Sequence, residues 1–306
     1  CTFCGQCANV CPVGAILEKD NTNTVWEKLY DPNYHVMVQL APAVRVSIGE
    51  EIGLKTGLIS NGKLVSAIKR LGFNNVYDTD FTADLTIMEE GTELINRIKT
   101  GGVLPLMTSC CPGWINLAEQ EYPEILPHIS SCKSPQQMFG TLAKTYFAEK
   151  ENMDPKNIYV VSIMPCIAKK HEAARPEMEY EGIRDVDHVL TTREYARMLK
   201  RMNIDFMNLE DSFPHGRIAR YTGAGIIFGV SGGVMEAALR TVVEVLEKRT
   251  LESLDFEVTR GVDEIKEATL NVAGIDVNIA IVHGGRAIKE FFEILKTGEK
   301  QYHFVE

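Results

Sequence analysis

The chain has 306 residues, of which 45% are hydrophobic and 24% charged, as expected of a globular protein with a sizeable buried core. Its net charge of −10 argues against nucleic acid or an anionic membrane as the main partner. No apolar run reaches the roughly 20 residues that a transmembrane helix needs. Of the eight cysteines, the first group has metal-ligand spacing, which favours reduced thiols and a cytoplasmic location over disulfides.

A run of four cysteines opens the chain. Cys1, Cys4, Cys7 and Cys11, with Pro12 directly after, follow the C-x₂-C-x₂-C-x₃-C-P spacing of bacterial ferredoxins. A zinc site or a disulfide knot is the alternative, but zinc ribbons separate two cysteine pairs by about a dozen residues or more. We therefore expect residues 1–20 to be part of a ferredoxin-like [4Fe–4S] segment, with further chain upstream. The polar residues from 18 to 23 predict a linker, which we extend over 21–34.

From residue 35 onward, short apolar runs alternate with longer amphipathic stretches. Buried strands are expected at 36–40, 103–107, 158–164 and 277–282. Helices are expected at 63–71, 83–99, 135–150, 192–202 and 233–248. This alternation predicts an α/β domain over 35–306 with mostly parallel sheets flanked by helices. Three of the expected strands end directly before proline or cysteine clusters, at the edge where open α/β sheets bind ligands.

The segment TSCCPGW, residues 108–114, follows one of these strands. Adjacent cysteines point in different directions, so Cys110 and Cys111 cannot serve one metal in the same way. One of them can ligate a metal while the other remains a thiol. The alternative is a pair of buried cysteines in a turn.

Two further cysteines lie apart from the others. Cys166, in the segment MPCIAKKHE at 164–172, is followed by Lys169 and Lys170, which would stabilise an anion beside the thiolate. The alternative is an ordinary buried cysteine with lysines on the surface. Cys132 is expected to act as a small buried hydrophobe.

Together these segments resemble the [FeFe]-hydrogenase family. TSCCPGW and MPCxxKxxE are similar to the first two of its three characteristic segments. The resemblance continues through APA at 41–43, SSCKSPQQ at 130–137 and GAGIIFGVSGGVME at 223–236, and so covers nearly the whole chain. It implies a two-lobed H-cluster domain over 35–306, with the cluster between the lobes.

The resemblance also implies the cofactor. The family's H-cluster joins a [4Fe–4S] cube, through a cysteine sulfur, to a two-iron unit with CO, cyanide and a bridging dithiolate. Cys111 and Cys166 match two of the four cube ligands. The other two belong to a third segment, CxxxC, which we expect shortly after Glu306 and consider necessary for activity.

A proton relay is implied as well. Cys110 matches a thiol that exchanges protons with the cluster, and the family's path continues through Glu90, Ser130 and Glu93 toward Arg97. On a helix, Glu90, Glu93 and Arg97 share one face. Without the resemblance, a solvated and salt-bridged helix face is the favoured interpretation.

Other positions match residues around the cyanide and CO ligands in the family. Lys169 matches a side chain that hydrogen-bonds one cyanide, and Pro42 and Ala43 match the segment that holds the other. The family often has serine at Ala43, so a side-chain donor is missing here. Gln136 and Met164 match outer contacts that orient the cofactor.

The expected activity of the intact enzyme is 2H⁺ + 2e⁻ ⇌ H₂. Electrons are expected from ferredoxin or from a subunit that oxidises NAD(P)H, and maturation proteins must build the two-iron unit. A non-catalytic iron–sulfur assembly factor and a hydrogen sensor are the alternatives. Cys110, Glu90, Glu93 and Lys169 together argue against both, and a simple electron carrier would not need residues 30–306.

Overall fold

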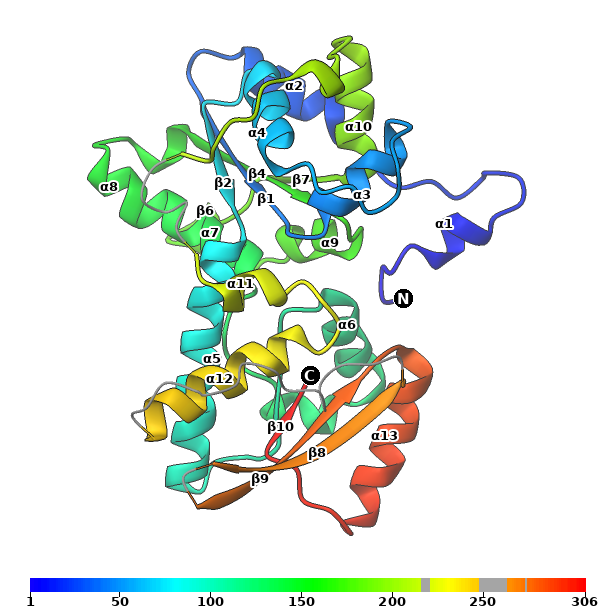
Figure 1. Ribbon diagram of the computed structural model, residues 1–306, viewed down its shortest axis with the longest axis vertical. Helices are drawn as coiled ribbons and strands as arrows, with labels where there is room; N and C mark the ends of the chain where they lie inside the picture. Colours follow the sequence, from blue (N-terminus) through cyan, green and yellow to red (C-terminus); the bar gives the residue numbers. More distant parts are fainter. Residues whose placement is uncertain (216–220, 248–262, 273) are drawn as a thin grey trace. The chain divides into compact units, whose positions relative to one another are not determined.

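The computed structural model describes residues 1–215, 221–247, 263–272 and 274–306 (Figure 1). The described residues form two compact units. Unit 1 comprises those within Cys1–Thr82 and Pro135–Arg220, and unit 2 those within Ala83–Ser134 and Tyr221–Glu306. No described helix is both long and apolar enough to cross a membrane. None of the eight cysteines, all within the described ranges, forms a disulfide.

Unit 1 is built on a four-stranded parallel sheet with the strand order β2-β1-β4-β7. The strands are β1 (His35–Leu40), β2 (Asn75–Asp78), β4 (Ile158–Met164) and β7 (His188–Thr191). All seven residues of β4 are buried, as expected for a central parallel strand whose two faces are covered by helices. A short hairpin, β5 (Glu179–Tyr180) and β6 (Ile183–Arg184), lies apart from this sheet.

The helices of unit 1 are α1 (Gln6–Val10), α2 (Thr22–Tyr30), α3 (Val44–Glu51), α4 (Asn61–Arg70), α7 (Pro135–Leu142), α8 (Ala148–Lys150), α9 (Ala168–Ala174) and α10 (Thr192–Arg201). A π-helical turn, Ala143–Phe147, joins α7 to α8. The start of α10 is fixed by a capping box in which Thr191 and Glu194 exchange hydrogen bonds. Side chains from the sheet and from these helices, except α1, share one hydrophobic core.

The strand order of unit 1 reverses beside β1. From β1 the chain goes to β2 on one side, and β4 and β7 lie on the other side. β1 and β4 are direct neighbours, with Leu40 opposite Ile163 near their carboxyl ends. Ligands of open α/β sheets bind outside the strand ends at such a reversal.

Unit 2 contains a mixed sheet with the strand order β3-β10-β9-β8. Its strands are β3 (Leu106–Met107), β8 (Ile265–Val272), β9 (Ile275–Val282) and β10 (Phe304–Val305). β3, β10 and β9 are parallel, and β8 pairs antiparallel with β9. The helices are α5 (Asp80–Thr100), which begins in unit 1, α6 (Pro112–Glu121), α11 (Gly223–Ile227), α12 (Gly233–Glu247) and α13 (Gly285–Thr297).

Alternating side chains give this sheet two separate cores. Leu106, Ile279 and Phe304 pack with α5 and α12, whereas their neighbours Met107 and Val305 pack with α6 and α13. Successive residues of a strand point to opposite faces, which explains the division. Figure 1 shows α12 and α13 on the two sides of β8 and β9.

Most of the expected elements are confirmed. The α/β class with mostly parallel sheets is correct, as are three of the four strands. The strand expected at 103–107 has only two residues, because Pro105 has no N–H to give to a neighbouring strand. Four of the expected helices are present within one to three residues, except that residue 248 lies outside the described residues, and the helix expected at 135–150 is α7 and α8 joined by the π-helical turn.

The linker prediction for 21–34 is wrong as regards local structure, because α2 occupies most of it. Val25 is fully buried in the core of unit 1. The Asn21 backbone N–H donates to Glu194 Oε1 at 2.7 Å, and its side chain donates to the Val189 carbonyl at 3.0 Å. The polar composition of this segment concealed one apolar face of α2, which packs into the core of unit 1.

Candidate functional site

The four N-terminal cysteines lie in and around α1. The Gln6 N–H, followed by the Thr2 side chain, lowers the pKa of Cys4, and the N–H groups of Ile16, Val13 and Ala15 lower the pKa of Cys11. Backbone donors around a sulfur stabilise the thiolate, the form that binds iron. Among the described residues, no three His, Cys, Asp or Glu side chains stand close enough to hold one metal ion.

The same segment lines a cavity of about 640 Å³ within unit 1. Cys1, Cys4 and Cys7 contribute to its wall, and the Phe3 ring stacks on His171 with the ring centroids 4.1 Å apart. Gly5, at φ +81°, approaches Ile167 so closely that an added Cβ would lie 2.8 Å from its Cγ2. Only glycine fits both the backbone conformation and this approach.

Except for Gln136, which lies on α7, the predicted cofactor-binding residues of unit 1 lie at or follow the carboxyl ends of β1 and β4. Pro42 and Ala43 follow β1, and Ala43 is the N-cap of α3. Met164 ends β4, Cys166 follows it in the loop, and Lys169 lies in the first turn of α9. Because the two strands are adjacent and parallel, all five positions belong to one edge of the sheet, at the reversal of strand order.

Gln136 and Lys169 meet at a residue to which the sequence assigned no role, Glu172. Lys169 Nζ lies 3.0 Å from Glu172 Oε2, and Gln136 Nε2 donates to the same oxygen at 2.9 Å. Glu172 is buried, and its spacing of three residues from Lys169 on a helix was the available signal. Gln136 Oε1 is buried without a hydrogen-bond partner in the described residues. A buried amide with one unmatched atom fits a site that a bound group or water completes.

The second cysteine pair lies in unit 2, after β3. Cys111 is the N-cap of α6, and Pro112 occupies the first helical position. Trp114 Nε1 donates to the Thr108 carbonyl at 3.1 Å, which closes the turn that carries both cysteines. Cys111 is exposed and lies at the N-terminal end of α6, where the helix dipole stabilises a negative charge such as that of a thiolate.

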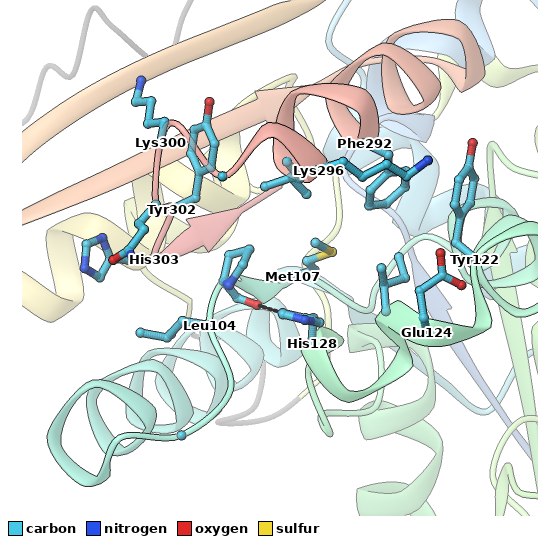
Figure 2. Close-up of a pocket in the computed structure, with 16 residues that line it drawn as sticks. Leu104, Met107, Tyr122, Glu124, His128, Phe292, Lys296, Lys300, Tyr302 and His303 are labelled. Carbon is cyan, nitrogen blue, oxygen red and sulfur yellow. Dashed lines mark hydrogen bonds between the residues drawn. The ribbon is translucent and has the colours of Figure 1, made fainter.

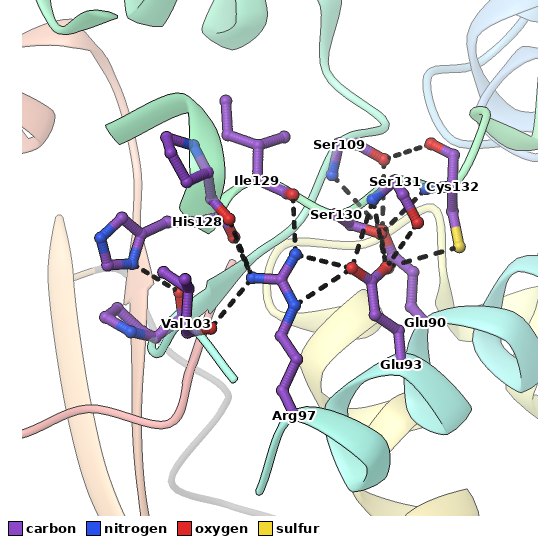
Figure 3. A network of polar contacts seen from close by, with 12 residues as sticks. Glu90, Glu93, Arg97, Val103, Ser109, His128, Ile129, Ser130, Ser131 and Cys132 are labelled. Atoms are coloured by element: carbon purple, nitrogen blue, oxygen red, sulfur yellow. Dashed lines mark hydrogen bonds and ion pairs between the residues drawn. The ribbon is translucent and has the colours of Figure 1, made fainter. Parts of the chain in front are cut away.

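Glu90 and Glu93 connect to this turn through serine hydroxyls (Figure 3). Glu90 is 1% exposed, and Oε1 accepts from the Ser109 N–H at 3.4 Å and from its hydroxyl at 3.3 Å. Burial raises the pKa of Glu90 to about 7, although the Ser109 N–H and the hydroxyls of Ser130 and Ser109 oppose the shift. Ser130 also donates to Glu93 Oε2 at 2.9 Å, so its hydroxyl touches both carboxyl groups. Cys110 is the residue after Ser109.

Arg97 forms the outer end of this row. Its Nη2 lies 2.6 Å from Glu93 Oε1, in an ion pair one helical turn long. The structure therefore brings together four of the five predicted relay residues and places Cys110 next to Ser109. A solvated helix face, the alternative interpretation, does not describe the buried Glu90.

Cys132 is more than the small buried hydrophobe expected of it. Its sulfur lies 4.0 Å from Glu93 Oε2, and its carbonyl accepts from the Ser109 hydroxyl at 2.7 Å. Burial, with smaller contributions from nearby carboxylates, raises the pKa of Cys132 to about 11, so it stays a thiol. Ser131, also unassigned from the sequence, donates to the same Glu93 oxygen from its N–H at 3.1 Å and its hydroxyl at 3.3 Å.

A second cavity, of about 580 Å³, lies wholly within unit 2 (Figure 2). Met107 and Phe292 form part of an apolar wall, and His128, Tyr302 and His303 add polar groups. None of the predicted site residues lines it. The size of a cavity alone therefore does not identify the candidate site of this protein.

Two family models match the chain. Residues 34–306 match the C-terminal domain of the iron-only hydrogenase large subunit, and residues 1–17 match a 4Fe-4S binding domain. Iron hydrogenase 1 of Clostridium pasteurianum is 47% identical over 295 residues, which cover 96% of this chain and 51% of that protein. The periplasmic [Fe] hydrogenase large subunit of Nitratidesulfovibrio vulgaris is 50% identical over 284 residues, which cover 92% of this chain and 68% of that protein.

A more distant relative has a different name. The cytosolic Fe-S cluster assembly factor narfl of Xenopus tropicalis is 36% identical over 256 residues, or 80% of this chain and 53% of that protein. Among solved structures, an apo [FeFe]-hydrogenase from Chlamydomonas reinhardtii matches with a TM-score of 0.83 and 38% identity, covering 94% of this chain and 81% of that one. The chain spans about half to two thirds of the length of these curated relatives.

Proposed function

Because the chain belongs to the iron-only hydrogenase large-subunit family, we propose that the whole protein interconverts protons, electrons and dihydrogen at an H-cluster. Its electron partner is ferredoxin or a subunit that oxidises NAD(P)H, and electrons pass through clusters held by the N-terminal cysteines. Maturation proteins supply the two-iron unit. The proposed compartment is the cytoplasm.

The residues divide into ligands and supporting groups. Cys111 and Cys166 bind the cube of the H-cluster, together with cysteines of the third characteristic segment. When bound, the cluster supplies the two-electron redox chemistry of hydrogen. Lys169, held by Glu172, and the N-terminal end of α3 at Pro42 and Ala43 stabilise the negative charge of its cyanide ligands.

One observation carries this proposal over its alternatives: the row from Glu90 through Ser130 to Glu93. A buried carboxyl with a pKa of about 7 is half-protonated near neutral pH, so it both accepts and donates protons there. Such a group costs folding free energy, and its location beside the cysteine turn is typical of a functional site. Cys110, next to Ser109, is the proposed inner partner of Glu90.

An iron–sulfur assembly factor is the second candidate, supported by the relative from Xenopus tropicalis. Such a protein has no use for a proton relay, whereas it needs cluster ligands. A hydrogen sensor would keep the cluster but tolerate loss of the relay. A measurement of hydrogen turnover therefore distinguishes the enzyme from both alternatives.

The test is hydrogen evolution from reduced methyl viologen without oxygen, after the clusters and a synthetic two-iron cofactor have been loaded. The chain is compared with a longer version that includes the third characteristic segment. We expect turnover only in the longer version. A longer version that is fully loaded with clusters and still inactive would refute the enzymatic proposal and favour the assembly factor or the sensor.

The iron–sulfur segment gives a separate prediction. Cys4→Ala removes a sulfur that backbone donors stabilise, so we expect the protein to lose about one cluster's iron after anaerobic reconstitution. Iron and sulfide counts per chain, with the visible absorption of the clusters, measure the loss. Cys132→Ala, which removes a thiol outside the predicted ligand set, is the matched control and should keep its iron. Equal iron in both variants would contradict the assignment of Cys4.

A further inference from the structure

The two oxygens of Glu93 share the Ser131 N–H, at 3.4 Å from Oε1, but otherwise have different partners. Oε1 accepts from Arg97, at 3.1 Å from Nε and 2.6 Å from Nη2. Oε2 accepts from the Ser130 hydroxyl at 2.9 Å, from the Ser131 hydroxyl at 3.3 Å and from the Ser131 N–H at 3.1 Å, and the Cys132 sulfur lies 4.0 Å away. The first oxygen is therefore anchored to a fixed charge, and the second faces groups that can exchange protons.

Arg97 is poorly suited to carry a proton. A guanidinium has five N–H donors, no acceptor, and does not release a proton in proteins. Its Nη1 donates to the carbonyls of Val103, Pro127 and His128 at 3.0–3.2 Å, and its Nη2 also donates to Ile129 at 3.1 Å. With the two contacts to Glu93, every N–H group of the side chain is engaged (Figure 3).

Ser131 has the properties that Arg97 lacks. A hydroxyl both donates and accepts, so it can pass a proton without holding charge. Ser131 is an exposed residue, whereas Ser130 on the same carboxylate oxygen is 7% exposed. The two hydroxyls thus lie on the buried and the solvent side of one atom, Glu93 Oε2.

We infer that Ser131 is the point where the proton row exchanges with solvent, and that Arg97 is a positioning residue that holds Glu93 in place. The inference rests on the proposed function. In the inward direction, a hydronium ion gives a proton to Ser131 Oγ while the Ser131 hydroxyl proton moves to Glu93 Oε2. Water is left outside and Glu93 becomes neutral. In the outward direction the same protons move in reverse, and no electron changes place.

The test follows deuterium uptake by the Glu90 carboxyl after rapid mixing of the holoprotein with heavy water. Infrared spectroscopy detects the C=O band of the protonated acid, at a pH just below its pKa of about 7. Glu90→Gln identifies the band. We expect Ser131→Ala to slow the uptake at least about tenfold and Ser131→Thr, which restores a hydroxyl, to recover most of the rate.

Thr92→Ala is the matched control, because it removes an exposed hydroxyl from the residue beside Glu93. It should exchange at the wild-type rate. Ser130→Ala tests the row itself and should also slow uptake. Normal uptake in Ser131→Ala with slow uptake in Ser130→Ala would overturn the inference alone. Normal uptake in both variants would overturn the inference and the proposed row together.

Discussion

Glu90→Gln is expected to lower hydrogen turnover by about 10²- to 10⁴-fold, the contribution of a positioned proton donor and acceptor. The amide keeps the shape of the side chain and can still accept from Ser109 and Ser130, but it cannot carry the proton. Hydrogen evolution from reduced methyl viologen measures the loss, in preparations with equal iron content. Glu89→Gln is the control, since Glu89 is the exposed neighbour on the same helix. If Glu90→Gln kept hydrogen turnover within about twofold of wild type, as the control should, the role of Glu90 in the proton relay would be contradicted.

The same variant should change stability with a defined pH dependence. Burial raises the pKa of Glu90 from 4.5 to about 7, so the folded state disfavours its charged form. The contribution of the protonated Glu90 carboxyl to the free energy of unfolding is therefore fully present below pH 4.5 and is lost as pH rises through 7. Above that range, Glu90→Gln should be more stable than wild type by up to about 3 kcal/mol, and the difference should shrink as pH falls. Glu306, whose pKa burial also raises to about 7, is present in both proteins and cancels in the comparison.

Arg45→Met is expected to destabilise unit 1 by about 3–5 kcal/mol, because it leaves two buried carboxylates without their cation. Arg45 Nη2 lies 2.5 Å from both Asp78 Oδ1 and Asp80 Oδ2. Asp80 is fully buried, so water cannot replace the lost charge. Urea unfolding measures the change through Trp26, whose ring packs against the core of unit 1. A Trp114→Phe background removes the indole of unit 2 from the signal.

Arg70→Met is the matched control for that measurement. Arg70 is exposed at the end of α4, and the structure gives it no ion pair within the described residues. Its replacement should change the unfolding free energy by less than about 0.5 kcal/mol. If both variants lost the same small amount, the buried triad of Arg45, Asp78 and Asp80 would not be the stabilising feature that its geometry indicates.

Strong local patterns made parts of this fold predictable. β4 is a run of seven apolar or small residues, and α10 begins with a capping box that the sequence itself encodes. β10 was not predictable, because a two-residue strand has no periodicity and depends entirely on β3 and β9 on either side. Similarly, α2 was hidden in a polar segment whose apolar face is recognisable only once its packing partner is known.

The candidate site divides in the same way. The cysteine motifs and the spacing of Glu90, Glu93 and Arg97 are local patterns, so these residues could be predicted as site residues from the sequence. Ser131 and Cys132 contact Glu93 across 38 and 39 residues of chain, and no local spacing indicates such a contact. Glu172 had a local signal, three residues after Lys169, but its contact with Gln136 spans 36 residues.

The pairing of β3 with β10 has a consequence for synthesis on the ribosome. Leu106 lies opposite Phe304, so the strand that leads into the cysteine turn pairs on one side with a strand nearly two hundred positions later, and its other described partner is a single β-bridge from Met107 to Ile129. A nascent chain can complete the sheet of unit 1 once residue 191 has emerged, but β3 must wait for β10. Long-range pairings of this kind form late, since loop closure must precede them. We therefore expect the turn that holds Cys110 and Cys111 to gain the support of its sheet only after translation has passed Val305, and stable metal binding there to follow that step.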